Sequence, residues 1–176
     1  MGEDATVTDE DGRRGTPLVD EVIKKAAVAW VTVADEPARG LWCAPLEGAL
    51  LVVSGPGEQA APGLAEATAA QVTMRGDHGG RVVTWSARVD RLLPGTEEWE
   101  TVAPLVAAKR LNASGATADL IQRWADEGCA LTRLTPAGDT VSGEALPTDS
   151  LAEPPRDTPA ARATRKPFRL HRVRRR

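Results

Sequence analysis

The sequence predicts an α+β domain that is predominantly β, a small barrel of six antiparallel strands with flanking helices. Short runs rich in β-branched residues alternate with turn residues between positions 28 and 93. Helical patterns precede and follow this region, and a chain of 176 residues has room for one domain of ordinary size. A barrel is favoured over a sandwich because closure removes sheet edges and helices can plug its ends.

A short helix is expected to open the folded unit. Thr16 is a hydroxyl cap, and Pro17 suits the first position of a helix. Three strands rich in β-branched and apolar residues then follow in meander order, at residues 28–33, 41–46 and 49–53.

A loop of small residues at 54–57 and an alanine-rich helical piece around 64–69 lead into a β-hairpin. Its strands span 70–75 and 81–93, and a tight glycine-rich turn at 76–80 joins them. The apolar residues of the second strand share one face, which predicts that they belong to the core: Val83, Trp85, Ala87 and Val89.

Two helices and a last strand complete the predicted unit. Thr96 caps a helix with an acidic first turn, and Lys109 and Arg110 follow in its last turn. This charge order suits the helix macrodipole, which is the favoured explanation of the two basic residues. A second helix is expected over 117–127 and a final strand over 129–134.

Both ends of the chain are expected to be disordered around a folded unit at 16–135. Residues 1–15 are acidic and residues 136–176 are first rich in proline and alanine and then basic, with little to bury in either segment. Eight of the 22 basic residues follow Ala161, so the rest of the chain holds 14 basic and 25 acidic residues. Nucleic-acid binding by this tail is a disfavoured alternative, because Phe168 is its one phenyl or indole side chain.

Several classes of protein are excluded by what the sequence lacks. The longest apolar stretch, 26–34, is about half of a bilayer span, and Met1 is followed by Gly2, Glu3 and Asp4 instead of a basic and then apolar start, so we expect a cytoplasmic protein without membrane contact. Cys43 and Cys129 lack metal-ligand spacing, so we expect buried thiols and no metal. Common hydrolase, metalloprotease and nucleotide-binding motifs are absent, and His78 is typical of a solvated turn.

The region between Trp42 and Val89 carries a family resemblance. It reads WCAPLEGALLVVSGPGEQAAPGL, then AQVTMR, then GGRVVTWSARV: a strand, a polar turn, a strand, a loop of small residues, a helix and two long strands. This order resembles the pyridoxamine 5′-phosphate oxidase-like superfamily of FMN-binding split barrels over residues 26–134. The resemblance implies a split barrel that forms a homodimer, with FMN or a deazaflavin at the subunit interface.

The resemblance also implies that the cofactor lies at the end of the third strand and on the hairpin that follows. Carried over, the candidate cofactor-binding residues are Ser54, Gly55, Gly57, Gln59, Arg75, Arg81, Thr84, Trp85 and Ser86. Hydroxyls, the N–H groups of a glycine loop and an arginine are the groups that a phosphate prefers, and Trp85 or Trp42 offers a flat wall for a flavin ring. The alternative is that the loop is a plain turn and that the two arginines are solvated.

The loop departs from the family pattern at two positions. Many members place an arginine or lysine just after it, where this chain has Glu58 and Gln59. A carboxylate repels a phosphate unless another charge intervenes. This departure keeps a cofactor-free barrel open as an alternative.

Two functional hypotheses follow. The first is a dimeric flavoprotein oxidoreductase that transfers a hydride or electrons between FMN or a deazaflavin and a small organic molecule. No catalytic residue is assigned, because the cofactor carries the chemistry in such proteins. The second is a cofactor-free split barrel that binds a small ligand or acts as an interaction module.

Overall fold

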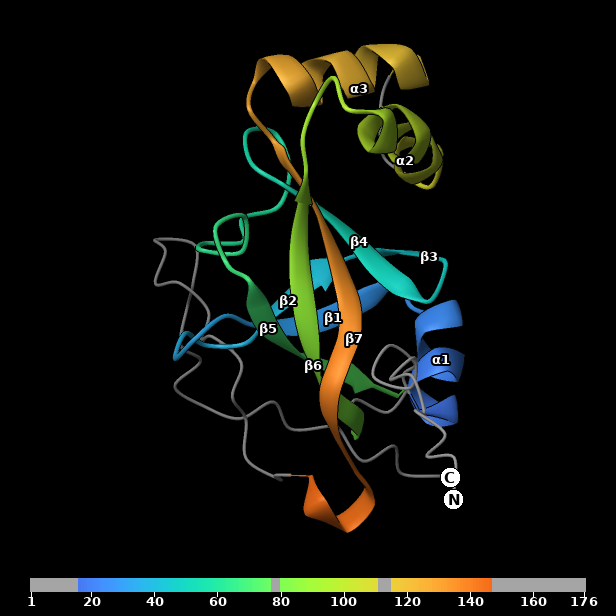
Figure 1. Cartoon of the computed structure of the whole chain (residues 1–176), viewed down its shortest axis with the longest axis vertical. Coiled ribbons are helices and arrows are strands. Elements are labelled where there is room, and N and C mark those ends of the chain that lie inside the picture. The colour runs from blue at the N-terminus through green and yellow to red at the C-terminus, as the bar shows by residue number, and fades with distance from the viewer. Residues whose placement is uncertain (1–15, 77–79, 111–114, 147–176) are drawn as a thin grey trace, which may run out of the picture.

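The computed structural model describes residues 16–76, 80–110 and 115–146. A single antiparallel sheet of seven strands curls at its centre, with one helix beside the sheet and two helices packed over one end (Figure 1). His78, the acidic N-terminal segment and the basic tail lie outside the described residues.

The elements follow one another in the predicted order, and two hydroxyl caps are confirmed. The Thr16 side chain accepts a hydrogen bond from the Val19 N–H, and that of Thr96 accepts one from the Trp99 N–H. The elements are α1 (Pro17–Lys24), β1 (Val28–Thr32), β2 (Arg39–Trp42), β3 (Ala44–Leu46), β4 (Ala49–Ser54), β5 (Ala69–Arg75), β6 (Arg81–Leu92), α2 (Glu97–Ala108), α3 (Thr117–Asp126), β7 (Ala130–Ser142) and the 3-10 helix η2 (Gly143–Ala145). Within the described ranges no helix is long and apolar enough to cross a bilayer.

The sheet has seven strands rather than six because the chain breaks at Cys43. The strand expected over 41–46 is two strands, β2 and β3, and they form opposite edges of the order β2-β1-β5-β6-β7-β4-β3. One residue, Cys43, separates the two edges along the chain. The sheet must therefore curl until its edges come together, which is the geometry of a split barrel.

The alanine-rich piece around 64–69 is a series of turns and not a helix. The Leu64 N–H donates to the Ala61 carbonyl at 3.2 Å, which closes a four-residue turn, and Gly63 has a φ of 74°. Leu64 is fully buried against the barrel interior. Burial of this leucine and the positive φ of the glycine override the helix propensity of the alanines.

The last strand continues past Thr135, where the sequence places the end of the folded unit, and reaches Ser142. Its pairing with β6 shifts register between Trp85 and Ala87. Gly138 has a φ of 77° beside this irregularity and is the residue that lets the strand bulge and resume. Proline and glycine thus mark a β-bulge here instead of the start of a tail.

Two apolar cores lie on opposite faces of β4, whose six residues are all buried. The barrel core is enclosed by the sheet and α1 and includes Leu50 and Val52, together with the predicted face of β6. The helical core lies under α2 and α3 and includes Leu51 and Val53. Because β4 serves both cores, it fixes the two helices relative to the barrel.

We expect Leu50→Ala and Leu51→Ala each to lower the free energy of unfolding by about 2–5 kcal/mol, because each side chain fills a different packed core. Urea denaturation measures both values. Leu105→Ala is the control, since Leu105 is 46% exposed on α2, and it should change stability by no more than about 0.5 kcal/mol. A small effect for either core leucine would contradict burial on both faces of β4.

Candidate functional site

Two open grooves adjoin beside the loop that joins β4 to β5. The Ser54 groove has a volume of about 440 Å³, and its lining includes Ser54, Gly55, Gly63, Glu66, Arg91 and Ala130. The Ser86 groove has a volume of about 610 Å³, and its lining includes Thr32, Val33, Gly63, Glu66, Gln71 and Ser86. Gly63 and Glu66 belong to both grooves, so one continuous surface runs from the end of β4 to the middle of β6.

This surface brings together three of the residues that the sequence singles out. Ser54 and Gly55 lie at one end of it and Ser86 at the other. Ser86 is exposed, whereas Ser54 is 6% exposed and forms part of the groove wall. The two serines come from strands that are separated by β7 in the sheet.

The two candidate arginines lie elsewhere. Arg75 and Arg81 are paired in register at the far end of the β5–β6 hairpin, four positions along β5 from Gln71, the nearest β5 residue that lines the groove. That spacing corresponds to about 13 Å along a strand. The Arg75 guanidinium lies 4.5 Å from the centre of the Trp30 ring, so it stacks on an indole of the outer sheet face.

Thr84 and the candidate tryptophans are also engaged within the fold. The Thr84 hydroxyl is hydrogen-bonded to that of Thr73 at 2.8 Å. Trp85 is 1% exposed in the barrel core and offers no open surface for stacking a ring. Trp42 is half-buried, with the Arg110 guanidinium 5.6 Å from its ring centre.

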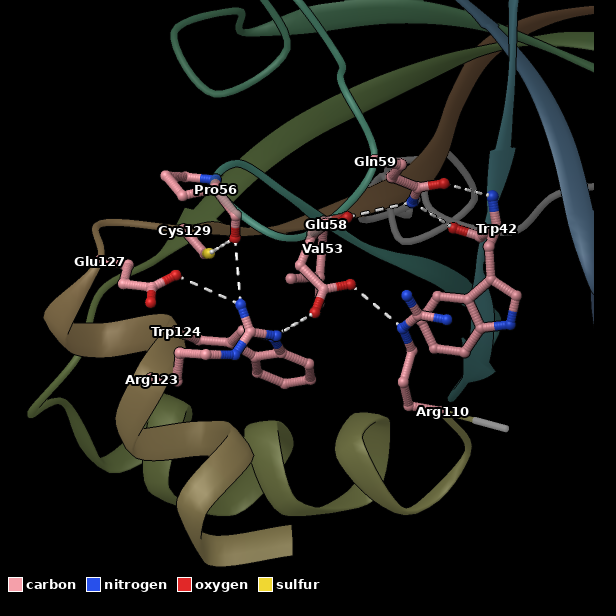
Figure 2. Close-up of polar contacts among 10 residues, drawn as sticks. All are labelled: Trp42, Val53, Pro56, Glu58, Gln59, Arg110, Arg123, Trp124, Glu127 and Cys129. Carbon is pink, nitrogen blue, oxygen red and sulfur yellow. Dashed lines mark hydrogen bonds and ion pairs between the residues drawn. The ribbon is translucent and has the colours of Figure 1, made fainter. Parts of the chain in front are cut away.

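Gln59 closes the split in the barrel with its side-chain amide. Its Oε1 accepts from the Trp42 N–H at 2.7 Å, and its Nε2 donates to the Trp42 carbonyl at 2.8 Å and to the Val53 carbonyl at 3.0 Å (Figure 2). The amide therefore bonds to the edge strand β2 as a neighbouring strand would, and it ties that edge to β4. These three hydrogen bonds engage both polar atoms of the amide with backbone groups of the protein itself.

Glu58 links helices α2 and α3 to the same loop. Its carboxylate accepts hydrogen bonds from Arg123 Nη2 at 2.6 Å, Trp124 Nε1 at 3.0 Å and Arg110 Nε at 3.1 Å (Figure 2). The Glu58 side chain is only 4% exposed. Two arginines therefore compensate the charge that the sequence leaves unexplained, and the carboxylate is directed at α3 and the end of α2.

The pKa of Glu58 reflects this environment. Burial alone would raise the pKa of the carboxyl, but the hydrogen bonds from Trp124 and Arg123 and the positive charge of Arg110 outweigh it. The net result is a pKa below the ordinary value of 4.5.

Lys109, the other basic residue at the end of α2, donates to the Pro45 carbonyl at 2.6 Å. Lys109 and Arg110 therefore follow the last turn of α2, which ends at Ala108, instead of lying within it, and each side chain has a specific partner.

Glycine is required at two points of the loop because other chain segments approach closely. A Cβ on Gly55 would lie 3.0 Å from the Cys129 Cα, and Gly55 has a φ of 132°. A Cβ on Gly57 would lie 2.5 Å from Arg123 Nη1, and Gly57 has a φ of 69°. Gly57 therefore makes room for the arginine that binds Glu58 and does not line either groove.

Both cysteines are free and buried, as the sequence predicts. Burial raises the pKa of the Cys43 thiol to about 12, and burial is also the main cause that raises the pKa of Cys129. The Cys129 thiol donates to the Pro56 carbonyl at 3.3 Å. Neither thiol is suited to be a nucleophile at neutral pH.

Sequence reasoning missed two charged residues of the grooves, Arg91 and Glu66. Arg91 is exposed near the end of β6 and lines the Ser54 groove. Within the part of the chain that the structure describes, it has no carboxylate at ion-pair distance. The one sequence signal for Arg91 is an arginine on the otherwise apolar face of a strand, two positions after Val89.

Comparison of the sequence with protein-family models and with curated proteins finds no match. Solved structures are similar in fold. A conserved hypothetical protein from Mycobacterium tuberculosis superposes with a TM-score of 0.51 at 11% identity, over 79% of this chain and 93% of that one. The heme storage protein HutZ from Vibrio cholerae gives 0.49 at 16% identity, over 73% and 94%. A putative pyridoxamine 5′-phosphate oxidase from Listeria innocua gives 0.46 at 12%, over 69% and 92%. The chain has the split-barrel fold of the resemblance.

We expect Glu58→Gln to lower the free energy of unfolding at pH 7 by about 1–3 kcal/mol, because it removes charge-assisted bonds at a buried site. Glu127→Gln is the control: Glu127 also pairs with Arg123 but is 45% exposed, and its loss should cost a few tenths, about 0.5 kcal/mol at most.

The difference between the wild type and Glu58→Gln should depend on pH. The folded-state pKa of Glu58 lies below the unfolded value near 4.5, so its stabilisation is present above pH 4.5 and is lost as pH falls through the folded pKa. Urea midpoints between pH 7 and pH 3 should therefore converge for the two proteins. A constant difference down to pH 3 would contradict the assignment.

Proposed function

We propose that the protein binds a flavin, FMN or a deazaflavin, in the two joined grooves and uses it to transfer a hydride or electrons to or from a small organic molecule. The observation that carries this proposal is the continuity of the Ser54 and Ser86 grooves through Gly63 and Glu66. Their combined volume suits a ligand with a polar tail and a ring, and the family resemblance of the sequence favours a flavin.

The residues of the grooves fit the two ends of such a ligand. At one end Ser54, Gly55 and Arg91 provide a hydroxyl, a glycine backbone and a guanidinium, which are groups that bind a phosphate. Glu58 does not oppose the phosphate, because its carboxylate is held by Arg110 and Arg123 and does not line the groove.

The Ser86 groove supplies the surroundings of the ring. Thr32, Gln71 and Ser86 are polar side chains that can hydrogen-bond the ring edges, while Val33 and Ala67 provide apolar surface. A bound flavin supplies the hydride or electron pair itself. The chain binds, orients and partly shields it, and needs no acid or base of its own for that step.

A second candidate function is a cofactor-free barrel that binds a small ligand or acts as an interaction module. It is favoured by the loop that follows β4, where Glu58 and Gln59 are used to hold the fold together. It is also favoured by Trp85, whose burial leaves the grooves without a tryptophan wall.

A homodimer is part of the proposal, and the outer face of the sheet is its proposed interface. Trp30, Thr73, Thr84 and Val141 are register partners across β1, β5, β6 and β7. Val28 precedes Trp30 on the same face and is 50% exposed, and Val141 is 36% exposed. Exposed apolar side chains on the outer face of neighbouring strands are suited to association with a second copy.

The first test is the visible absorption spectrum of the purified protein, before and after FMN is added and the excess removed. We expect flavin bands that remain with the protein. Ser54→Ala should weaken FMN binding about tenfold, because it removes a hydroxyl from the phosphate end. Ser142→Ala, at the opposite end of the β6–β7 pair, is the control and should bind FMN normally.

The spectrum and the thermal midpoint together discriminate the two candidate functions. A ligand that binds only the folded state raises the midpoint. A colourless protein whose midpoint rises with neither FMN nor a deazaflavin would reject the flavin proposal and leave the cofactor-free barrel.

The dimer has its own test. We expect Val28→Glu to convert a dimer to a monomer in light scattering, because it places a charge in the proposed interface. Leu18→Glu, at a residue that is 40% exposed on α1, should leave the mass unchanged. A wild-type monomer, or equal dissociation by both variants, would reject this interface.

A further inference from the structure

Helix α2 presents an apolar face to solvent. Its inner face, which includes Trp99, Val102 and Val106, is buried in the helical core. A surface helix normally carries charged residues on the opposite side. The exposed residues in the last two turns of α2 are instead all uncharged, and we call them the outer face of α2: Thr101, Pro104, Leu105 and Ala108. The Thr101 hydroxyl is used within the helix, where it donates to the Glu97 carbonyl at 2.9 Å.

The neighbouring helix α3 has the ordinary pattern. Asp119, Gln122 and Asp126 are exposed on it, whereas Leu120 and Trp124 are buried. Both helices pack on the same core and differ in what they present to solvent. Packing against the barrel therefore does not explain the outer face of α2, and the contrast indicates a contact that α3 does not make.

Hydrogen-bond acceptors adjoin the outer face of α2. Pro104 has no N–H, so the Glu100 carbonyl lacks the donor that a helix ordinarily supplies four residues later. Glu97 and Glu100 precede Thr101 and Pro104 by four residues, which places their exposed carboxylates on the same side of the helix. Among the described residues, no cation lies at ion-pair distance from either carboxylate. A partner of this face should therefore combine positive charge and N–H donors with apolar side chains.

The last twelve residues of the chain have this composition. Residues 165–176 hold seven arginine or lysine side chains and no acidic one, and they include the apolar Phe168, Leu170 and Val173. Arginine side chains are suited to bind both carboxylates and a backbone carbonyl. The three apolar side chains are suited to an uncharged helix face. Charge and apolar character therefore match between this segment and α2.

The chain is long enough for this segment to reach α2. The described residues end at Leu146, near the start of β6, because Ser142 pairs with Val83. Helix α2 follows the other end of β6, so the two points are separated by about the length of that 12-residue strand, about 40 Å (Figure 1). The intervening residues 147–164 can span at most about 60 Å.

A segment of the same chain suits the small outer face of α2 better than a second copy does. A specific interface between separate proteins buries at least about 1,000 Å², and one face of two helical turns offers much less. A tethered segment does not need that area, because the linker keeps it near the face at a high effective concentration.

We infer that the C-terminal segment, residues 165–176, docks on the outer face of α2 of its own chain. Its apolar side chains cover Leu105 and the adjacent residues, and its arginines bind the two carboxylates and the Glu100 carbonyl. Because these charges remain at the rim of the contact, docking weakens as the salt concentration rises. The contact is separate from the grooves and does not depend on a flavin.

A spin label at the C-terminus of the full-length protein tests this contact. Arg176→Cys provides the attachment point, because Cys43 and Cys129 are buried and the pKa of each thiol is raised. In isotope-labelled protein at low salt, we expect the spin label to broaden the NMR signals of residues 101–108 and to leave those of α1 unchanged. The broadening should be lost at high salt. No broadening over α2 at low salt, or equal broadening of α1 and α2, would overturn the proposal.

Substitutions in the spin-labelled protein separate docking from general charge attraction. Leu105→Lys removes the central apolar contact and adds a like charge, so the docking equilibrium constant should fall at least about tenfold. Leu18→Lys is the matched control, because Leu18 is 40% exposed on α1, and it should leave the broadening of α2 unchanged. Phe168→Ser retains every charge of the segment and should weaken docking several-fold. Equal effects of the two lysine variants, or no effect of Phe168→Ser, would overturn the docking site.

A mixing experiment identifies the chain that supplies the segment. Spin-labelled protein without isotope is mixed with isotope-labelled wild type, and we expect no broadening of α2, since the contact lies within one chain. Broadening of α2 in the mixture would assign the segment to a second copy and overturn the contact within one chain. A wild type whose segment leaves α2 unaffected but binds a single-stranded oligonucleotide at low salt would assign the segment to nucleic acid and overturn the proposal.

Discussion

The structure depends on the closure of a sheet whose two edges are one residue apart in the sequence. Backbone groups at a sheet edge need partners, and β2 receives them from the Gln59 amide, which pairs with both the N–H and the carbonyl of Trp42. The same amide reaches the Val53 carbonyl, so one side chain spans the split. The adjacent residue, Glu58, fixes the helices that cover β4. Two neighbouring residues therefore hold the barrel closed and hold helices α2 and α3 in place over β4.

This closure also determines where the grooves lie. Gln59 is bound to β2 and β4 and Glu58 to the helices, and the chain that follows them continues as turns, anchored by the buried Leu64. Gly63 and Glu66 of that segment form the shared wall of both grooves. The position of the candidate site thus follows from this closure. A substitution that weakens the contacts of Gln59 or Glu58 would alter the grooves, although neither residue lines them.

Local signals predicted the parts of the fold that depend on local interactions. The caps at Thr16 and Thr96 and the alternation along β6 are properties of short segments, and all are confirmed. The break at Cys43 and the partners of Glu58 are not local: Arg123 and Trp124 lie 65 and 66 positions away in the sequence. From the sequence alone, a carboxylate after a glycine loop indicates repulsion of a phosphate. Its role in a structural ion pair can be recognised only when the structure places its partners beside it. Of the candidate residues named from the sequence, Ser54, Gly55 and Ser86 line the grooves, whereas Arg91 could be assigned to the groove only from the structure.

The use of Glu58 and Gln59 bears on where an anion can bind in this barrel. The sequence resemblance associates a basic residue with this part of the loop, but in this chain the two side chains are fully engaged in closing the fold. Any positive charge for the groove must come from another strand, and Arg91 of β6 is the arginine that lines it.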